Sequence, residues 1–187
     1  MLRCPLSERP EDQRKKRLQR RIVREFLLEY NLEWGTKFQV HRDGEPPEPD
    51  VICRDSRTRD QIGIEVTIEY YEGAHARSVW EQARGKKAPE YYLTQPDSQE
   101  NLRVLRRVNQ AMQRKSKKAY SFPGRLMLLV TTEPIRLYLT RMKKALAILR
   151  VPAQHPFNET YLYSTHGEPY QLFPERKWIG TYRSLNG

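Results

Sequence analysis

The stretch PEPDVICRDSRTRDQIGIEVT, residues 47–67, contains two short apolar runs separated by a charged segment. Both runs have strand length and are rich in β-branched residues, so we expect two neighbouring strands joined by residues 54–60. Apolar residues alternate along the second strand, which places Glu65 and Thr67 together on the face opposite its isoleucines. A carboxylate beside a buried strand is costly unless it is paired or holds a cation. Asp50 and Glu65 therefore require a compensating partner.

Composition indicates one core and a polyanionic partner. The chain has 187 residues, of which 37% are hydrophobic, enough for one well-formed core but short for two. Lys and Arg number 34 against 23 Asp and Glu, which gives a net charge of +11. This balance favours nucleic acid as a partner, and the alternative is a basic surface that serves only solubility.

Cysteine and histidine usage argues against soft-metal chemistry. The two cysteines do not suggest a disulfide framework, and the four histidines are scattered singly without zinc-ligand spacing. Any bound metal should therefore be a hard ion held by oxygen atoms. No run approaches the roughly 18 apolar residues of a membrane span, so we expect a soluble cytoplasmic protein that does not contact membranes.

Periodicity predicts an α/β fold with one mixed sheet flanked by helices, in the order αβββαβαβ, within a single domain over residues 1–187. A helix is also expected near residues 75–86. The expected elements are a helix from about residue 8 to 31, strands at 36–42, 50–53 and 61–70, a helix at 98–120, a strand at 124–132, a helix at 136–150 and a last strand at 159–165.

The spacing of the acidic residues resembles a known family. Pro49-Asp50, a fifteen-residue interval and Glu65-Val66-Thr67 in a strand are similar to the motif of the PD-(D/E)xK nuclease superfamily, whose fold is called restriction endonuclease-like. The order helix, three strands, helix, strand is similar too. The resemblance implies a Mg²⁺-dependent nuclease that hydrolyses DNA phosphodiester bonds. Asp50, Glu65 and the Val66 backbone carbonyl would hold Mg²⁺, which Mn²⁺ could replace.

The resemblance covers a core of about residues 20–132 and leaves residues 133–187 as a C-terminal extension. Asp50 could alternatively cap a turn, and Glu65 could pair with a basic residue on a neighbouring strand. A catalytically inactive module that binds nucleic acid or a protein partner, and a ribonuclease, are the alternative functions.

The motif departs from the family at Thr67, where the superfamily usually has lysine. Helical spacing places Lys115 within the apolar stripe of the 98–120 helix, formed with Val104, Val108, Ala111, Met112 and Ala119. Lys115 would reach over the sheet toward Glu65 as a migrated lysine, or its stem would cover apolar surface while its ammonium lies in water. Lys118 is the second choice.

Two further site residues are expected only by resemblance. Glu25 is the expected first-helix acid, with Glu29 as the other acid that flanks the apolar face, and Gln82 would contribute an amide. For Glu25 the alternative is a surface ion pair.

Basic residues would contact nucleic acid, or they would simply form a solvated face. Cutting both strands of a duplex would favour a homodimer. The residues expected to bind nucleic acid are Arg14, Lys15, Lys16, Arg17, Arg21, Lys86, Lys87 and Lys118.

Overall fold

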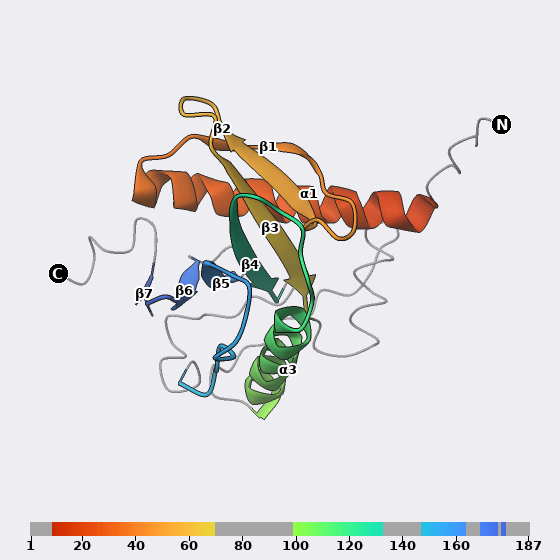
Figure 1. Cartoon of the computed structure of the whole chain (residues 1–187). Coiled ribbons are helices and arrows are strands. Elements are labelled where there is room, and N and C mark those ends of the chain that lie inside the picture. The colour runs from red at the N-terminus through yellow and green to blue at the C-terminus, as the bar shows by residue number, and fades with distance from the viewer. Residues whose placement is uncertain (1–8, 70–98, 133–146, 164–168, 176, 179–187) are drawn as a thin grey trace, which may run out of the picture.

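The computed structural model describes residues 9–69, 99–132, 147–163, 169–175 and 177–178 (Figure 1). Several expectations lie outside these residues: the helix near 75–86 with Gln82, Lys86 and Lys87, and most of the helix expected at 136–150.

The described elements are two helices and seven strands that form one sheet in the order β1 to β7. β1, β2 and β3 are antiparallel, β4 and β5 run parallel to β3, and β6 and β7 return antiparallel. The elements are α1 (Pro10–Trp34), β1 (Phe38–Asp43), β2 (Val51–Asp55), β3 (Gln61–Ile68), α3 (Gln99–Ser116), β4 (Arg125–Thr131), β5 (Glu159–Tyr163), β6 (Tyr170–Phe173) and β7 (Lys177–Trp178).

The expected α/β class, the mixed sheet and its flanking helices are confirmed. The expectation that the strand near 159–165 is the last one is wrong, because β6 and β7 follow it and extend the same sheet. Residues after 132 therefore contribute strands to the sheet that carries the motif. No helix in the described part of the chain is long and apolar enough to cross a membrane.

Strand alternation divides the apolar residues between two faces of the sheet. On one face α1 packs over the alternate residues Ile62, Ile64 and Val66 of β3. On the other face α3 packs over β4 and β5. β4 is buried along nearly its whole length because its side chains enter both cores, as expected for a central strand.

The hairpin that joins β2 to β3 is closed by a carboxylate within the charged loop. The Asp55 carboxylate accepts backbone N–H bonds from Lys37 at 2.6 Å, Arg57 at 2.7 Å and Thr58 at 3.1 Å. Arg59 takes the left-handed conformation that completes the turn, with φ 69°. These bonds hold the register in which Val51 lies opposite Ile64.

The C-terminal end of α1 is tied to the first strand. Gly35 ends the helix in the left-handed conformation, with φ 60°, where glycine carries no steric cost. The Asn31 side chain donates to the Phe38 carbonyl and accepts from the Phe38 N–H, both at 2.9 Å. These bonds help to set the position of α1 relative to β1.

Candidate active site

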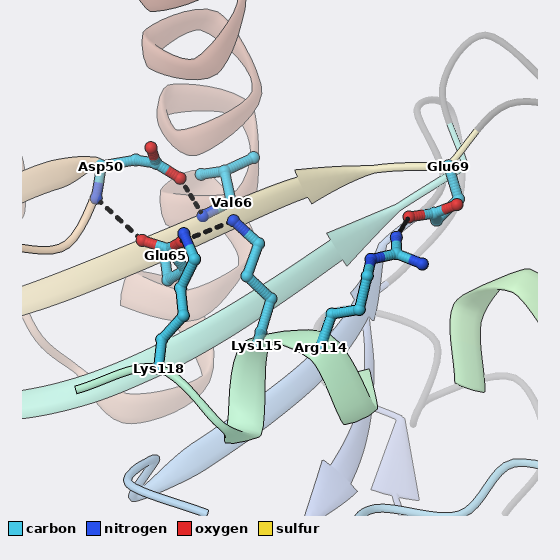
Figure 2. Close-up of polar contacts among 7 residues, drawn as sticks. All are labelled: Asp50, Glu65, Val66, Glu69, Arg114, Lys115 and Lys118. Carbon is cyan, nitrogen blue, oxygen red and sulfur yellow. Dashed lines mark hydrogen bonds and ion pairs between the residues drawn. The ribbon is translucent and has the colours of Figure 1, made fainter. Parts of the chain in front are cut away.

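Asp50 and Glu65 are brought together by the register of the β2–β3 hairpin. Because Val51 pairs with Ile64, the residue before β2 lies beside Glu65 of β3. The Asp50 N–H donates to Glu65 Oε2 at 3.2 Å, and the Val66 N–H donates to Asp50 Oδ2 at 3.0 Å (Figure 2). Asp50 therefore interacts across the hairpin, which differs from the alternative of a carboxylate that caps a turn.

The main chain around Asp50 is anchored on both sides. The Asp50 carbonyl accepts from the Gly44 N–H at 3.0 Å, and the Pro47 carbonyl accepts from the Ser121 N–H at 3.1 Å. A Cβ at Gly44 would lie 1.8 Å from the Pro49 carbonyl oxygen. Only glycine fits at position 44 while the backbone before Asp50 keeps this path.

The two carboxylates repel each other. Burial raises the pKa of Asp50, and the neighbouring Glu65 carboxylate raises this pKa further. The pKa of Asp50 is lowered in turn by Lys115, by the hydrogen bond from the Val66 N–H and by Lys15. Glu65 is itself almost inaccessible, with a side chain that is 3% exposed. The pair therefore needs positive charge in its surroundings.

Lys115 supplies part of this charge from α3. Its Nζ lies 2.5 Å from Glu65 Oε1, and its side chain is 18% exposed (Figure 2). The contact predicted from the apolar stripe is present, and the alternative of an ammonium that lies only in water is wrong. Val104, Val108, Ala111 and Met112 of the stripe are buried, whereas Ala119 follows the end of α3 and is exposed.

A second lysine reaches the same carboxylate. Lys118 lies in the segment after α3, and its Nζ is 3.4 Å from Glu65 Oε1. Its side chain is 56% exposed, so the ammonium has access to solvent and to a bound polyanion. Figure 2 shows Lys115 and Lys118 converging on Glu65, whereas Arg114 points to Glu69.

Thr67 stands where the resemblance leads us to expect a lysine, and it supplies no positive charge. It is buried, and its hydroxyl hydrogen-bonds with Glu69, which also pairs with Arg114 at 2.7 Å. A hydroxyl bears no charge, and this one faces a different carboxylate. Positive charge near the carboxylate pair comes from Lys115 and Lys118 and, at Asp50, from Lys15 of α1.

Tyr120 is a site residue that sequence reasoning missed. Its hydroxyl oxygen is buried near Glu65, and no described residue gives it a hydrogen bond of good geometry. Burial raises the pKa of Tyr120, and the negative charges of Glu65 and Asp50 raise it further. The ring packs on Phe157 with centroids 5.5 Å apart. In the sequence the only signal is its position two residues after Lys118.

On α1 the residue that interacts with Asp50 is Lys15. The ammonium lowers the pKa of Asp50, and Gln19, one turn later, is buried on the face that packs on the sheet. Glu25 makes no described hydrogen bond or ion pair with Asp50 or Glu65, and it lies ten residues along the helix from Lys15, about 15 Å along the axis. The structure does not bring Glu25 into the site.

The basic residues expected to bind nucleic acid from α1 differ in exposure. Arg17 and Arg21 are exposed, Arg14 and Lys16 are half-buried, and Lys15 is exposed. Arg20 forms a bidentate pair with Asp43 at the end of β1, at 2.5 and 2.6 Å, which secures this half of the helix to the sheet.

The donor set fits a hard divalent cation. Carboxylate oxygens are the ligands that Mg²⁺ prefers, and the ion usually keeps several waters. The N–H and C=O groups of one strand residue point to the same edge, so the Val66 carbonyl lies on the side where its N–H meets Asp50. In the described part of the chain no three His, Cys, Asp or Glu side chains gather as a metal site. Asp50, Glu65 and the Val66 carbonyl would hold the ion together with water.

Comparison with family models, with curated proteins and with solved structures finds no match for this chain. Function must therefore be inferred from the geometry of the site.

Proposed function

We propose that this protein is a divalent-metal-dependent nuclease that hydrolyses DNA phosphodiester bonds, with a variant PD-(D/E)xK site. The observation that carries the proposal is the arrangement of two neighbouring acidic residues, Asp50 and Glu65, which hydrogen bonds link across the hairpin, with the largely buried Lys115 of α3 paired to Glu65. Two negative side chains in a poorly solvated position are unfavourable in the absence of cations, and they suit a site that binds Mg²⁺ or Mn²⁺.

When bound, the metal ion activates a water molecule and neutralises charge on the reacting phosphate. Asp50 and Glu65 hold their oxygens in place because each accepts a backbone N–H from the opposite strand. Lys115 is oriented by Glu65 and donates to the attacking water or to a phosphate oxygen. Lys118, which is more exposed, contacts the incoming phosphate.

Nucleic acid as substrate is supported by charge. The net charge is +11, and exposed basic residues on the first half of α1 lie close to Lys15, which itself interacts with Asp50. Contacts of this kind bind phosphates without reading sequence, so binding should weaken steeply with salt, by about 0.9 logarithmic units per phosphate contact for each tenfold rise in salt.

The test is cleavage of supercoiled plasmid, single-stranded DNA and RNA with Mg²⁺, Mn²⁺ or EDTA. Asp50→Ala and Glu65→Ala should each reduce metal-dependent cleavage at least about 100-fold, the scale of losses when a group that stabilises transition-state charge is removed. Glu48→Ala is the matched control, because this nearby carboxylate pairs with Arg42 and touches neither site carboxylate. Intact cleavage by Asp50→Ala would contradict the proposal. Cleavage of RNA alone would change the substrate class and keep the site.

Two observations favour a second candidate, an inactive module that binds nucleic acid. Thr67 occupies the usual lysine position, and both oxygens of Glu65 already accept hydrogen bonds. Melting curves with added Mg²⁺ separate the two functions, because an ion that binds the folded state stabilises it. If the site binds metal, Mg²⁺ should raise the melting temperature of the wild type and leave that of Asp50→Ala unchanged. Retained binding to DNA with neither cleavage nor a Mg²⁺-dependent shift would favour the inactive module.

A further inference from the structure

A cavity of about 450 Å³ lies at the far end of α1 from Lys15. Its lining includes Tyr30, Trp34, Arg125, Glu159, Gln171 and Pro174. Nineteen residues separate Lys15 from Trp34, which is about 28 Å along the helix axis. Figure 1 shows α1 crossing the sheet, so the two ends of the helix serve different regions of the molecule. The volume lies within the range of small-ligand sites.

A buried carboxylate lies in the wall of this cavity. Glu159 Oε1 accepts from Tyr30 Oη at 3.4 Å and from an Arg125 guanidinium N–H at 3.3 Å, and Oε2 accepts from the Tyr161 hydroxyl. Burial raises the pKa of both tyrosines, so their hydroxyls stay protonated as donors. The two contacts of Oε1 are long, which leaves this oxygen able to accept a better-placed donor.

A second acceptor in the lining lacks a partner. Gln171 is 2% exposed, and its Nε2 donates to the Phe173 carbonyl at 3.2 Å. Its Oε1 is buried and accepts no hydrogen bond from any described residue. An unsatisfied buried acceptor is costly, so a ligand that donates an N–H here would relieve that cost.

The rest of the lining suits a flat ring that carries an anion. Trp34 is 42% exposed at the end of α1, and the exposed Pro174 adds further ring surface, whereas Tyr30 is buried beneath them. Arg125 is half-exposed and can offer guanidinium N–H groups beyond the one that contacts Glu159. Aromatic side chains of this kind stack on nucleobases, and an exposed guanidinium binds phosphate.

We propose that this cavity binds a guanine nucleotide, with the base against Trp34, its donor edge on Glu159 and Gln171, and its phosphate near Arg125. The two acceptors in the wall are oxygens: Glu159 Oε1, whose two contacts are long, and Gln171 Oε1, which has no described partner. The ligand edge that fits them must therefore carry two donors. Guanine offers an N–H and an exocyclic NH₂ side by side, whereas adenine offers one NH₂ beside an acceptor nitrogen. The source is a free nucleotide or a guanine of a nucleic-acid chain. The site is independent of the proposed nuclease function.

The test is calorimetric titration of the full chain in EDTA with GMP, AMP, CMP and UMP, and with single-stranded oligonucleotides that contain or lack guanine. EDTA prevents metal-dependent cleavage, so the result does not depend on Asp50 or Glu65. We expect saturable binding of GMP that is at least about tenfold tighter than that of AMP. Binding only of the guanine-containing oligonucleotide would support the same site with nucleic acid as the source.

Three variants locate the binding. Trp34→Ala should weaken it at least about fivefold, the low end of the stacking contribution of one base. Glu159→Gln should remove the preference for guanine, because one acceptor oxygen becomes a donor. Arg125→Ala should weaken the binding of GMP more than the binding of guanosine, which carries no phosphate. Leu32→Ala is the matched control, since this exposed α1 residue is not part of the cavity lining.

Two outcomes would overturn the proposal. One is the absence of saturable binding by every nucleotide and oligonucleotide at millimolar concentration. The other is binding that Trp34→Ala and Arg125→Ala leave unchanged. Melting curves of the variants show whether each is folded, and Arg125→Ala, which truncates a half-exposed side chain, keeps the test decisive if Glu159→Gln unfolds.

Discussion

Lys115→Met should destabilise the protein and abolish cleavage while metal binding is retained. Methionine keeps the unbranched stem that packs over the sheet and removes the ammonium 2.5 Å from Glu65 Oε1. The carboxylate, 3% exposed, would then depend on the Asp50 N–H and the more distant Lys118. Removal of Lys115 also takes away a positive charge that lowers the pKa of Asp50, so this pKa should rise further.

The magnitude follows from burial. Loss of one partner from a fully buried ion pair costs about 3–5 kcal/mol. Here Lys118 remains 3.4 Å away and Lys115 is 18% exposed, so we expect about 2 kcal/mol. For a chain of this length that corresponds to a fall of about 4–8 °C in melting temperature.

Lys118→Met is the matched control, because it removes a second ammonium from the same carboxylate oxygen. Its side chain is 56% exposed, so the pair should contribute about 0.5 kcal/mol, or a fall of about 1–2 °C. Thermal unfolding of both variants in EDTA at pH 7, with cleavage assays on the same preparations, measures the difference.

Equal destabilisation by the two substitutions would refute the assignment of Lys115 as the principal partner of Glu65. A fall in melting temperature with full cleavage would refute its catalytic role and keep the structural one.

Asp50→Asn should raise the melting temperature in EDTA at pH 7, because the pKa of Asp50 is raised in the folded state and its ionised form opposes folding beside Glu65. The stability that the protonated Asp50 carboxyl contributes is fully present below its unfolded pKa and is lost as pH rises through its folded pKa. The stability gained by Asp50→Asn should therefore vanish in acid. A variant that is less stable than wild type at pH 7 would contradict this prediction. Gly44→Ala should lower stability and cleavage together, because a Cβ would lie 1.8 Å from the Pro49 carbonyl oxygen and would displace the segment that leads to Asp50; normal melting and cleavage would show that this segment adapts freely. Tyr120→Phe should change stability little, since the buried Tyr120 hydroxyl lacks a hydrogen bond of good geometry among described residues. The substitution should alter the pH profile of cleavage, because it changes the surroundings of both carboxylates. An unchanged pH profile would show that Tyr120 contributes only to packing.

Local periodicity was sufficient to predict the β2–β3 hairpin, the face on which Glu65 lies and the helix that carries Lys115. These features depend on spacing within one or two elements: alternation in a strand, 3.6 residues per turn in a helix and fifteen residues between two carboxylates. The stripe placed Lys115 on the face that covers the sheet, but its contact with Glu65 was one of two expectations, and the structure decided between them.

Only the tertiary structure decided which side chains from distant elements meet. How α1 lies across the sheet brings Lys15 near Asp50 and leaves Glu25 outside the site, although both lie on the same helix. Tyr120 and the cavity at Glu159 depend on packing between elements far apart in sequence, which periodicity does not encode. The two strands after β5 likewise required knowledge of sheet pairing, because short runs gain strand structure from their neighbours rather than from their own propensity.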